Sequence, residues 1–422
     1  MSAPRIQVPR GTYDVLPEHE LARRALEDAA RGILGGAGYR RIETPAFEAT
    51  ELFARGVGAS TDIVQKEMYT FVDGGERSLT LRPEGTAPVC RAYLEHGMQT
   101  QPQPVKLWYL SSFFRYERAQ AGRFRQFWQV GAEAIGSDDP AVDAESIVLL
   151  AALLDELEVR GVRLRLASLG SPAARAAYRG ALTAHLRANE QRLSQEVRAR
   201  IDLNPLRAFD ADDPATREVM ASAPRLIDWL DDDDAQHFAT VRALLDSAGV
   251  DYEVDPTLVR GLDYYTRTVF EFTSDALGAQ SGVGGGGRYD GLVEMLGGPP
   301  TPGMGWAAGI ERILLAGELR PAPEPLVDLF VAFDSDEQRA RAFALASEAR
   351  RAGLAVQQEL AGRSLKGQFK QADRLGARYI AVCGEDSIAF KDLQSGEQET
   401  VDSASGAVAM ALRGRHGMGQ PL

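Results

Sequence analysis

Residues 105–136 carry charged, amide and aromatic side chains at alternate positions along two segments joined by a short basic loop. Successive side chains of a strand point to opposite faces, so residues of equal parity share a face. The even-numbered face is mostly apolar and is predicted to be core: Trp108, Leu110, Phe114, Tyr116, Trp128, Val130, Ala132 and Ala134. The odd-numbered face carries Ser111, Arg115, Glu117, Phe127, Gln129 and Glu133.

This odd-numbered face, the polar floor, combines an arginine, two carboxylates, an amide and an aromatic ring. The loop above it adds Arg118 and Arg123. Such a surface can bind an anionic, aromatic ligand such as a nucleotide. The alternative is the solvated outer face of a hairpin, because antiparallel sheets often have one wet side. The spacing of the residues leaves both interpretations open.

Two side chains with oxygen acceptors begin the helix that is predicted after the strand pair EMYTFV and SLTLR. Glu84 and Thr86 lie in its first turn, where acidic and hydroxyl side chains usually satisfy free backbone N–H groups. A carboxylate is also the right partner for an ammonium group. Helix capping and ligand binding therefore both fit this segment.

Two later segments place arginines and tyrosines next to predicted strands. Residues 258–272 predict a glycine-containing turn with Arg260, Tyr264 and Tyr265, followed by a strand. A tyrosine pair more often packs in a core or an interface than binds a ligand. Further on, a strand of small residues runs into a helix with Arg312 in its first turn, a position that usually faces solvent.

The glycine run between these segments matches the GxGxxG spacing at Gly282, Gly284 and Gly287. A dinucleotide-binding fingerprint also requires an acidic residue about 20 positions on, at the end of a second parallel strand. The carboxylate near that distance, Glu311, lies in a predicted helix, which argues against a nicotinamide oxidoreductase. The glycines are instead predicted to let the backbone approach a ligand closely.

Composition limits the class of protein. With 422 residues, 44% hydrophobic and 25% charged, the chain is typical of a globular protein of two or three domains. Its two cysteines and five histidines show no metal-ligand spacing, which favours a reduced, cytoplasmic protein without structural zinc. It has no apolar run of about 18 residues, so we expect no membrane span. A net charge of −13 argues against indiscriminate coating of nucleic acid.

Three changes of pattern divide the chain. Residues 138–250 are helical in pattern, and the acidic run 231–234 is predicted to be a solvated loop. The segment LRPAPEPL predicts a stiff linker. Strands and helices then alternate, which predicts a small α/β domain.

A basic stripe is predicted on one helix of this last domain. Four basic side chains are spaced four apart, and residues 363–378 hold five Lys or Arg against one acid. The four are Lys366, Lys370, Arg374 and Arg378. A surface that tracks nucleic-acid phosphates and a solvated helix face are the two interpretations.

Several segments, in order along the chain, resemble the histidine-specific class II aminoacyl-tRNA synthetases. GYRRIETPAFE resembles motif 1 of this class. FFRYE and the following RFRQFWQVGAE resemble motif 2, and PGMGWAAGIERI resembles motif 3. LVRGLDYYTRTVFE and GGRYDGL resemble two histidine-specific motifs, and GRSLKGQFKQADRLGARYIAVCGEDSI resembles a synthetase anticodon-binding domain. The chain departs from the family at Ser111 and Ser112, where Gly-Pro is usual, and at Ala119, where proline is usual. These departures concern the rigidity of the motif 2 loop.

The resemblance implies an α+β catalytic domain with an antiparallel sheet over residues 1–320, with a helical insertion at about 170–245. A linker at 321–326 and an α/β anticodon-binding domain at 327–422 are expected to follow. It also implies a homodimer, to which motif 1 contributes.

The implied activity is the ligation of L-histidine to its tRNA. ATP activates histidine to histidyl-adenylate with release of pyrophosphate, and histidine then passes to the 3′-terminal adenosine of the tRNA. Mg²⁺ is expected on the ATP phosphates, with no metal ion held by protein side chains. The alternative is a regulatory paralogue that binds histidine without catalysis. Such a protein is expected to lack the anticodon domain and the motif arginines.

The resemblance also implies a role for each candidate residue. Arg260 and Arg115 are the expected catalytic residues, at the α-phosphate of ATP. The residues expected to bind histidine are Glu84, Thr86, Gln129, Glu133, Tyr264 and Tyr265. Those expected to bind ATP are Arg115, Glu117, Arg123, Phe127 and Arg312. The expected contacts to tRNA are Lys366, Lys370, Arg374 and Arg378.

Overall fold

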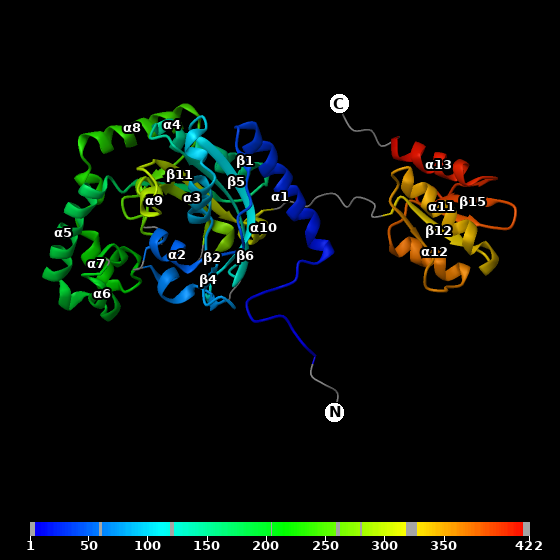
Figure 1. The fold of residues 1–422 in the computed structure, drawn as a ribbon, viewed down its shortest axis with the longest axis horizontal. Coiled ribbons are helices and arrows are strands. Elements are labelled where there is room, and N and C mark those ends of the chain that lie inside the picture. Colours follow the sequence, from blue (N-terminus) through cyan, green and yellow to red (C-terminus); the bar gives the residue numbers. More distant parts are fainter. Residues whose placement is uncertain are drawn as a thin grey trace. The chain divides into compact units, whose positions relative to one another are not determined.

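The computed structural model describes residues 5–58, 61–118, 122–203, 205–258, 262–278, 281–317 and 327–416. The chain forms two compact units, Met1–Pro321 and Ala322–Leu422 (Figure 1). None of the helices in these ranges combines the length and the apolar surface that a membrane-spanning segment requires.

The first unit is built on an eight-stranded sheet in the order β1-β5-β6-β11-β10-β9-β7-β8. All neighbouring strands are antiparallel except the outer pairs β1/β5 and β7/β8. The strands are β1 (Arg40–Arg41), β5 (Val105–Phe114), β6 (Gln126–Ile135), β7 (Val162–Ser168), β8 (Glu253–Val254), β9 (Thr266–Ser274), β10 (Gly282–Arg288) and β11 (Gly303–Gly309). A second sheet has the order β2-β4-β3, with β2 (Phe47–Ala49), β3 (Thr70–Val72) and β4 (Ser78–Leu81).

Helices cover both faces of the large sheet. The helices of this unit are α1 (Pro17–Gly36), α2 (Thr50–Gly56), α3 (Thr86–Glu95), α4 (Pro140–Glu156), α5 (Pro172–Ala188), α6 (Gln195–Arg200), α7 (Pro214–Ala221), α8 (Asp232–Ser247), α9 (Leu292–Met295) and α10 (Ile310–Ala316). Short helical turns are η1 (Ile63–Glu67), η2 (Met98–Thr100), η3 (Glu190–Arg192), η4 (Pro205–Asp210), η5 (Leu226–Trp229) and η6 (Asp275–Leu277).

The predicted hairpin at 105–136 forms as β5 and β6, paired antiparallel with Ser111 opposite Gln129. Its even-numbered face packs against α1, α4, α8 and α10 in the main core, as predicted. The odd-numbered face is not an outer surface, because Leu107, Tyr109 and Phe113 are buried in a second core with α3. Tyr116, predicted to be core, is instead 55% exposed, because β5 ends before it, at Phe114.

The motif 1 segment GYRRIETPAFE, in which the sequence predicts one edge strand, is not continuous in the structure. It is broken into β1 and β2, and Pro45 lies between them in neither strand. Proline has no backbone N–H to donate, so it does not continue a ladder of hydrogen bonds.

The region predicted to be helical contains β7, an inner strand between β9 and β8. Its alternation of apolar residues with Arg163 and Arg165 is the strand signal in the sequence. Helices α5, α6 and α7 enclose their own core and form a separate green lobe in Figure 1.

The acidic run 231–234 begins α8 and does not form a loop; Asp231, Asp232 and Asp233 are exposed as predicted, but Asp234 is buried. Asp231 caps α8 by accepting a hydrogen bond from the Asp234 backbone N–H at 2.8 Å. Asp234 is buried and pairs with the Arg267 guanidinium at 3.0 Å. A buried carboxylate needs such partners, so this run connects α8 to β9.

The second unit is a mixed sheet in the order β13-β12-β14-β15-β16, where β13, β12 and β14 are parallel and β15 and β16 antiparallel. The strands are β12 (Leu329–Phe333), β13 (Val356–Gln358), β14 (Tyr379–Cys383), β15 (Ile388–Asp392) and β16 (Gln398–Val401). The helices are α11 (Arg339–Arg351), α12 (Leu365–Arg374), α13 (Ala404–His416) and the turn η7 (Asp336–Gln338).

Only three of the four side chains of the predicted basic stripe lie on the helix. Lys366, Lys370 and Arg374 lie exposed on α12, which ends at Arg374. Arg378 lies beyond the helix, where its backbone N–H donates to the Val327 carbonyl at 3.1 Å and its guanidinium covers the Tyr379 ring. The expectation that all four side chains share one helix face is therefore wrong for Arg378.

Candidate active site

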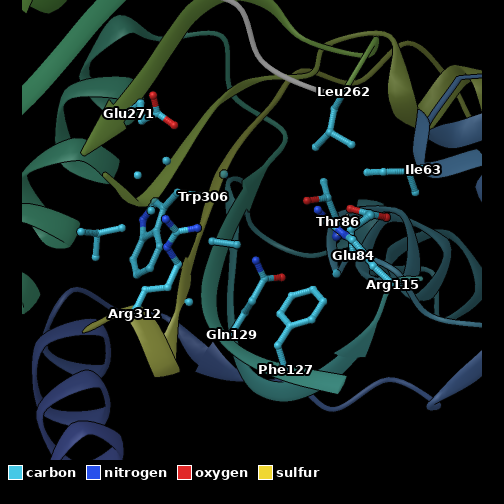
Figure 2. Close-up of a pocket in the computed structure, with 18 of the residues that line it drawn as sticks. Ile63, Glu84, Thr86, Arg115, Phe127, Gln129, Leu262, Glu271, Trp306 and Arg312 are labelled. Atoms are coloured by element: carbon cyan, nitrogen blue, oxygen red, sulfur yellow. Dashed lines mark hydrogen bonds between the residues drawn. The ribbon is translucent and has the colours of Figure 1, made fainter. Parts of the chain in front are cut away.

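A cavity of about 480 Å³ lies in the first unit, between the polar floor, the start of α3, β10 and β11. Figure 2 shows Arg312 and Trp306 on one side, Glu84, Thr86 and Arg115 on the other, and Gln129 and Phe127 between them. The residues expected to bind histidine or ATP that line it are Glu84, Thr86, Arg115, Glu117, Arg123, Phe127, Gln129, Tyr264, Tyr265 and Arg312. Arg260 and Ala119 lie outside the described residues.

One end of the cavity is acidic. Glu84 caps α3, because its carboxylate accepts hydrogen bonds from the backbone N–H groups of Thr86 at 2.8 Å and Ala87 at 3.0 Å. The Tyr264 hydroxyl donates to the same carboxylate at 3.4 Å. Glu84 thus does cap the helix, and it also lines the cavity. Burial raises the pKa of Glu84.

Glu133 lies directly behind this end and is fully buried, so it does not line the cavity. One carboxylate oxygen accepts from the Thr86 hydroxyl at 2.8 Å and the Tyr109 hydroxyl at 3.3 Å. The other accepts from the Tyr289 hydroxyl at 2.8 Å. Thr86, Tyr109 and Tyr289 all line the cavity, so Glu133 fixes the hydroxyls that a ligand meets.

Tyr109 and Tyr289 were not among the residues expected to bind histidine. Tyr109 shares odd parity with the polar floor, and Tyr289 lies within the GGRYDGL motif, so the sequence did hold a signal for both. Apolar positions dominate β5, however, and a tyrosine there is also an ordinary core residue. Only the hydrogen bonds to Glu133 distinguish the two roles.

Glycines make room for this network. A Cβ atom at Gly305 would overlap the Glu133 carboxylate, and one at Gly85 would lie 2.5 Å from the Tyr109 ring. Gly282, Gly284 and Gly285 of β10 line the cavity, so a close approach of this backbone to a ligand stays a prediction. The glycines also allow close strand packing, because a Cβ at Gly284 would lie 2.6 Å from the Ala308 Cβ on the neighbouring strand. β10 is antiparallel to both of its neighbours, which is incompatible with a dinucleotide-binding βαβ unit.

Away from Glu84 and Thr86 the lining becomes cationic and aromatic, from Arg115 at the boundary, past Phe127, to Arg312 on the opposite side. The Arg115 guanidinium donates to the Pro83 carbonyl at 2.8 Å and lies 5.4 Å from the centre of the Phe127 ring. Glu117 lies 3.8 Å from Arg115 and 3.4 Å from Arg123. Arg312 faces the cavity from α10, so the expectation of a solvent-facing arginine does not apply. Burial and the nearby Arg123 charge lower the pKa of Arg312.

The buried Glu133 predicts a pH dependence of stability. Burial raises its pKa from 4.5 to about 8, against the smaller opposing effect of the Tyr289 and Thr86 hydroxyls. Between these values the folded protein keeps a proton that the unfolded chain has released. Stability is therefore expected to fall as pH rises through this window, by up to about 1.4 kcal/mol per pH unit for one proton.

Chemical denaturation of the wild type and of Glu133→Gln across this pH range measures the effect. The amide does not titrate, so the variant is expected to lose this part of the slope. Parallel slopes for the two proteins would contradict the assignment of the proton to Glu133.

No cluster of three or more His, Cys, Asp or Glu side chains suited to a metal ion occurs in the part of the chain that the structure describes. Carboxylates do line the cavity, at Glu117, Glu271 and Glu311. These are hard oxygen donors of the kind that Mg²⁺ prefers.

Comparison with known proteins agrees with this geometry. The histidyl-tRNA synthetase family model matches residues 11–313, and an anticodon binding domain model matches residues 328–407. The chain is 45% identical to a histidine–tRNA ligase of Acetivibrio thermocellus over 94% of this chain and 97% of the relative. It is 50% identical to a histidine–tRNA ligase of Nocardia farcinica, over 93% of this chain and 94% of the relative.

Among solved structures, the apo histidyl-tRNA synthetase of S. aureus superposes with a TM-score of 0.81 at 38% identity. The match covers 96% of this chain and 99% of that chain. The class II fold inferred from the motifs is thereby confirmed, with an antiparallel-rich catalytic sheet and a C-terminal anticodon-binding domain. The chain belongs to the histidyl-tRNA synthetase family.

Proposed function

We propose that this protein is a histidine–tRNA ligase. It activates L-histidine with ATP to histidyl-adenylate and pyrophosphate, and then transfers histidine to the 3′-terminal adenosine of its tRNA. One observation carries the proposal: a single cavity joins an acidic, hydroxyl-rich end to a cationic, aromatic end. An amino acid and a nucleotide bound there would meet at the boundary, beside Arg115.

Histidine binds at the acidic end in this proposal. Glu84 and Thr86 hold the α-ammonium group, since a carboxylate is its natural partner. Gln129, Tyr264 and Tyr265 line the space for the imidazole. Glu133 acts on the imidazole through the Tyr109 and Tyr289 hydroxyls that it orients.

A site built on such hydrogen bonds rejects amino acids that cannot make them, by roughly 10⁴- to 10⁵-fold. No editing step is then needed for specificity.

ATP binds at the cationic end. Phe127 stacks on the adenine and Glu117 accepts from its amino group, while Arg123 and Arg312 bind the departing pyrophosphate. Arg115 stabilises the charge that develops on the α-phosphate, and Arg260 is assigned to the same task from the sequence alone. The histidine carboxylate is already ionised at neutral pH, so it attacks the α-phosphate without a general base.

Mg²⁺ would arrive with ATP. Its phosphate-bound form needs few protein ligands, and Glu271, on the wall near Arg312, is a carboxylate suited to hold it. The ion would supply positive charge to the phosphate oxygens.

The same family resemblance supports two further proposals. A homodimer through the motif 1 region is favoured by the exposed aromatic pair Phe47 and Phe71, whose rings meet edge to face at 6.1 Å on the small sheet. A reducing, cytoplasmic location is favoured by the free, buried thiols of Cys90 and Cys383.

The second unit is proposed to bind the tRNA through α12. Replacing Lys366, Lys370 and Arg374 with glutamine is expected to weaken tRNA binding and flatten its salt dependence, by about 0.7 to 0.9 in log–log slope for each phosphate that is no longer neutralised. Adding Arg378→Gln is expected to change the salt slope less than any one of the three substitutions on α12, because Arg378 lies beyond that helix.

Binding titrations over a range of salt concentrations measure these slopes. Histidine-dependent ATP/pyrophosphate exchange serves as the control and is expected to stay at the wild-type rate. A salt slope equal to that of the wild type would exclude α12 as the surface that binds tRNA.

The activity itself is tested by ATP/pyrophosphate exchange with each standard amino acid in turn. Exchange is expected with histidine and with no other standard amino acid. The enzyme is also expected to charge histidine tRNA with histidine. Histidine binding without any exchange would favour the regulatory paralogue, and exchange with another amino acid would overturn the specificity.

A further inference from the structure

The start of β6, beside the ATP end of the cavity, is held by Glu311 of α10 and by an N-terminal segment of the chain. On its β11 side, the ladder of β6 ends where Gln129 pairs with Gly309. Residues 126–128 therefore pair with β5 alone. Phe127, the proposed adenine platform, lies in this one-sided stretch.

Two groups hold the backbone around this stretch. The Glu311 carboxylate accepts the backbone N–H of Trp128 at 3.1 and 3.2 Å. The Gly11 carbonyl accepts the backbone N–H of Arg125 at 2.7 Å. The backbone is thus held two residues before Phe127, at Arg125, and one residue after it, at Trp128.

Glu311 is itself held by residues that lie far away in the sequence. The Tyr13 hydroxyl donates to its carboxylate at 2.6 Å and the Arg23 guanidinium at 2.9 Å. The pair of Arg23 and Glu311 is largely buried, with side-chain exposures of 14% and 8%. A buried charge depends on its partner much more than a surface charge does.

Aromatic contacts extend the same arrangement to the loop. The Tyr13 ring lies 4.5 Å, centre to centre, from Phe124, which lines the cavity. The Arg23 guanidinium lies 4.5 Å from the centre of the Trp128 ring. Gly11, Tyr13 and Arg23 together form what we call the N-terminal clamp.

We propose that the N-terminal clamp is a positioning device for the ATP half of the site. Its residues do not reach the ligand; they hold the start of β6 and the returning limb of the motif 2 loop, so that Phe127 and Arg123 face the nucleotide. Gln129 needs no such help, because strands on both sides hold it. The inference rests on the proposed function for the identity of the nucleotide.

The test separates ATP binding from histidine binding. Tyr13→Phe keeps the ring and removes the hydroxyl, and is expected to weaken ATP binding about 3- to 10-fold. Arg23→Gln leaves the buried Glu311 charge without its cation and is expected to weaken it about 10- to 100-fold. The histidine KM is expected to stay within about 2-fold of the wild type in both variants.

Tyr252→Phe is the matched control. The Tyr13 hydroxyl accepts an N–H of Arg23, and the Tyr252 hydroxyl likewise accepts one of Arg242, at 3.3 Å, but Tyr252 lies outside the cavity. ATP and histidine constants are expected to stay at wild-type values in this variant. The melting temperature of each protein is measured alongside.

A double-mutant cycle between Tyr13→Phe and Glu311→Gln is expected to show strong coupling in ATP affinity, since the hydroxyl acts through that carboxylate. Equal ATP affinity in all variants would overturn the inference. So would a parallel loss of ATP and histidine affinity with a lower melting temperature, which would mark a general packing role.

ATP dissociation constants are measured directly by calorimetry with MgATP. KM values are measured separately, by ATP/pyrophosphate exchange. A wild type that binds ATP but lacks histidine-dependent exchange would refute the proposed function. The calorimetric constants of the variants would still report on the clamp.

Discussion

Replacing Arg115 with alanine is expected to lower the rate of histidyl-adenylate formation by about 10²- to 10³-fold, in the range found when one transition-state donor is removed. Arg115 lies at the boundary between the two ends of the cavity, and its hydrogen bond to the Pro83 carbonyl fixes the guanidinium in place. Its charge is therefore already oriented before the α-phosphate becomes more negative. Single-turnover adenylation with saturating substrates measures the loss.

Two variants sharpen this prediction. Arg115→Lys keeps the charge but lacks the guanidinium fork, so an intermediate loss is expected. Arg118→Ala removes an exposed arginine of the same segment that does not line the cavity, and near-normal rates are expected. Normal turnover of Arg115→Ala with a much higher histidine KM would assign Arg115 to amino-acid binding instead.

Gly305→Ala is expected to abolish most histidine binding while leaving ATP binding nearly intact. The added Cβ would overlap the Glu133 carboxylate and lie 2.8 Å from the Ala132 carbonyl, so Glu133 has to move. Its displacement breaks the hydrogen bond from Tyr289 and leaves buried polar groups without partners, at about 1 to 3 kcal/mol for each. Histidine affinity is then expected to fall by about 10- to 150-fold.

Equilibrium binding of each ligand, together with thermal unfolding, checks this outcome. Gly180→Ala is the control, because a Cβ there meets no atom within 4 Å and alanine favours the helix. Adding Glu133→Asp to Gly305→Ala shortens the crowded side chain and is expected to recover stability more than histidine affinity. An unchanged histidine affinity in Gly305→Ala would show that the position of Glu133 does not matter for the ligand.

Local patterns in the sequence were sufficient for much of the fold. The alternation at 105–136 predicted the β5–β6 hairpin, and the predicted helices at α3 and α10 and the alternation of strands and helices in the second unit are present. The ordered motifs identified the class of fold and the family. These features depend on residues close together in the sequence, so they can be predicted from the sequence alone.

The tertiary structure alone decided how these elements serve the site. Whether the polar floor faces water depended on α3, which packs on it from a separate part of the chain. Glu133 accepts hydrogen bonds from hydroxyls in three separate segments of the chain, and the buried Asp234 pairs with Arg267, 33 residues away. Tyr13 and Glu311, 298 residues apart, meet at the edge of β6. Burial and pairing across such distances follow from packing, which no local pattern records.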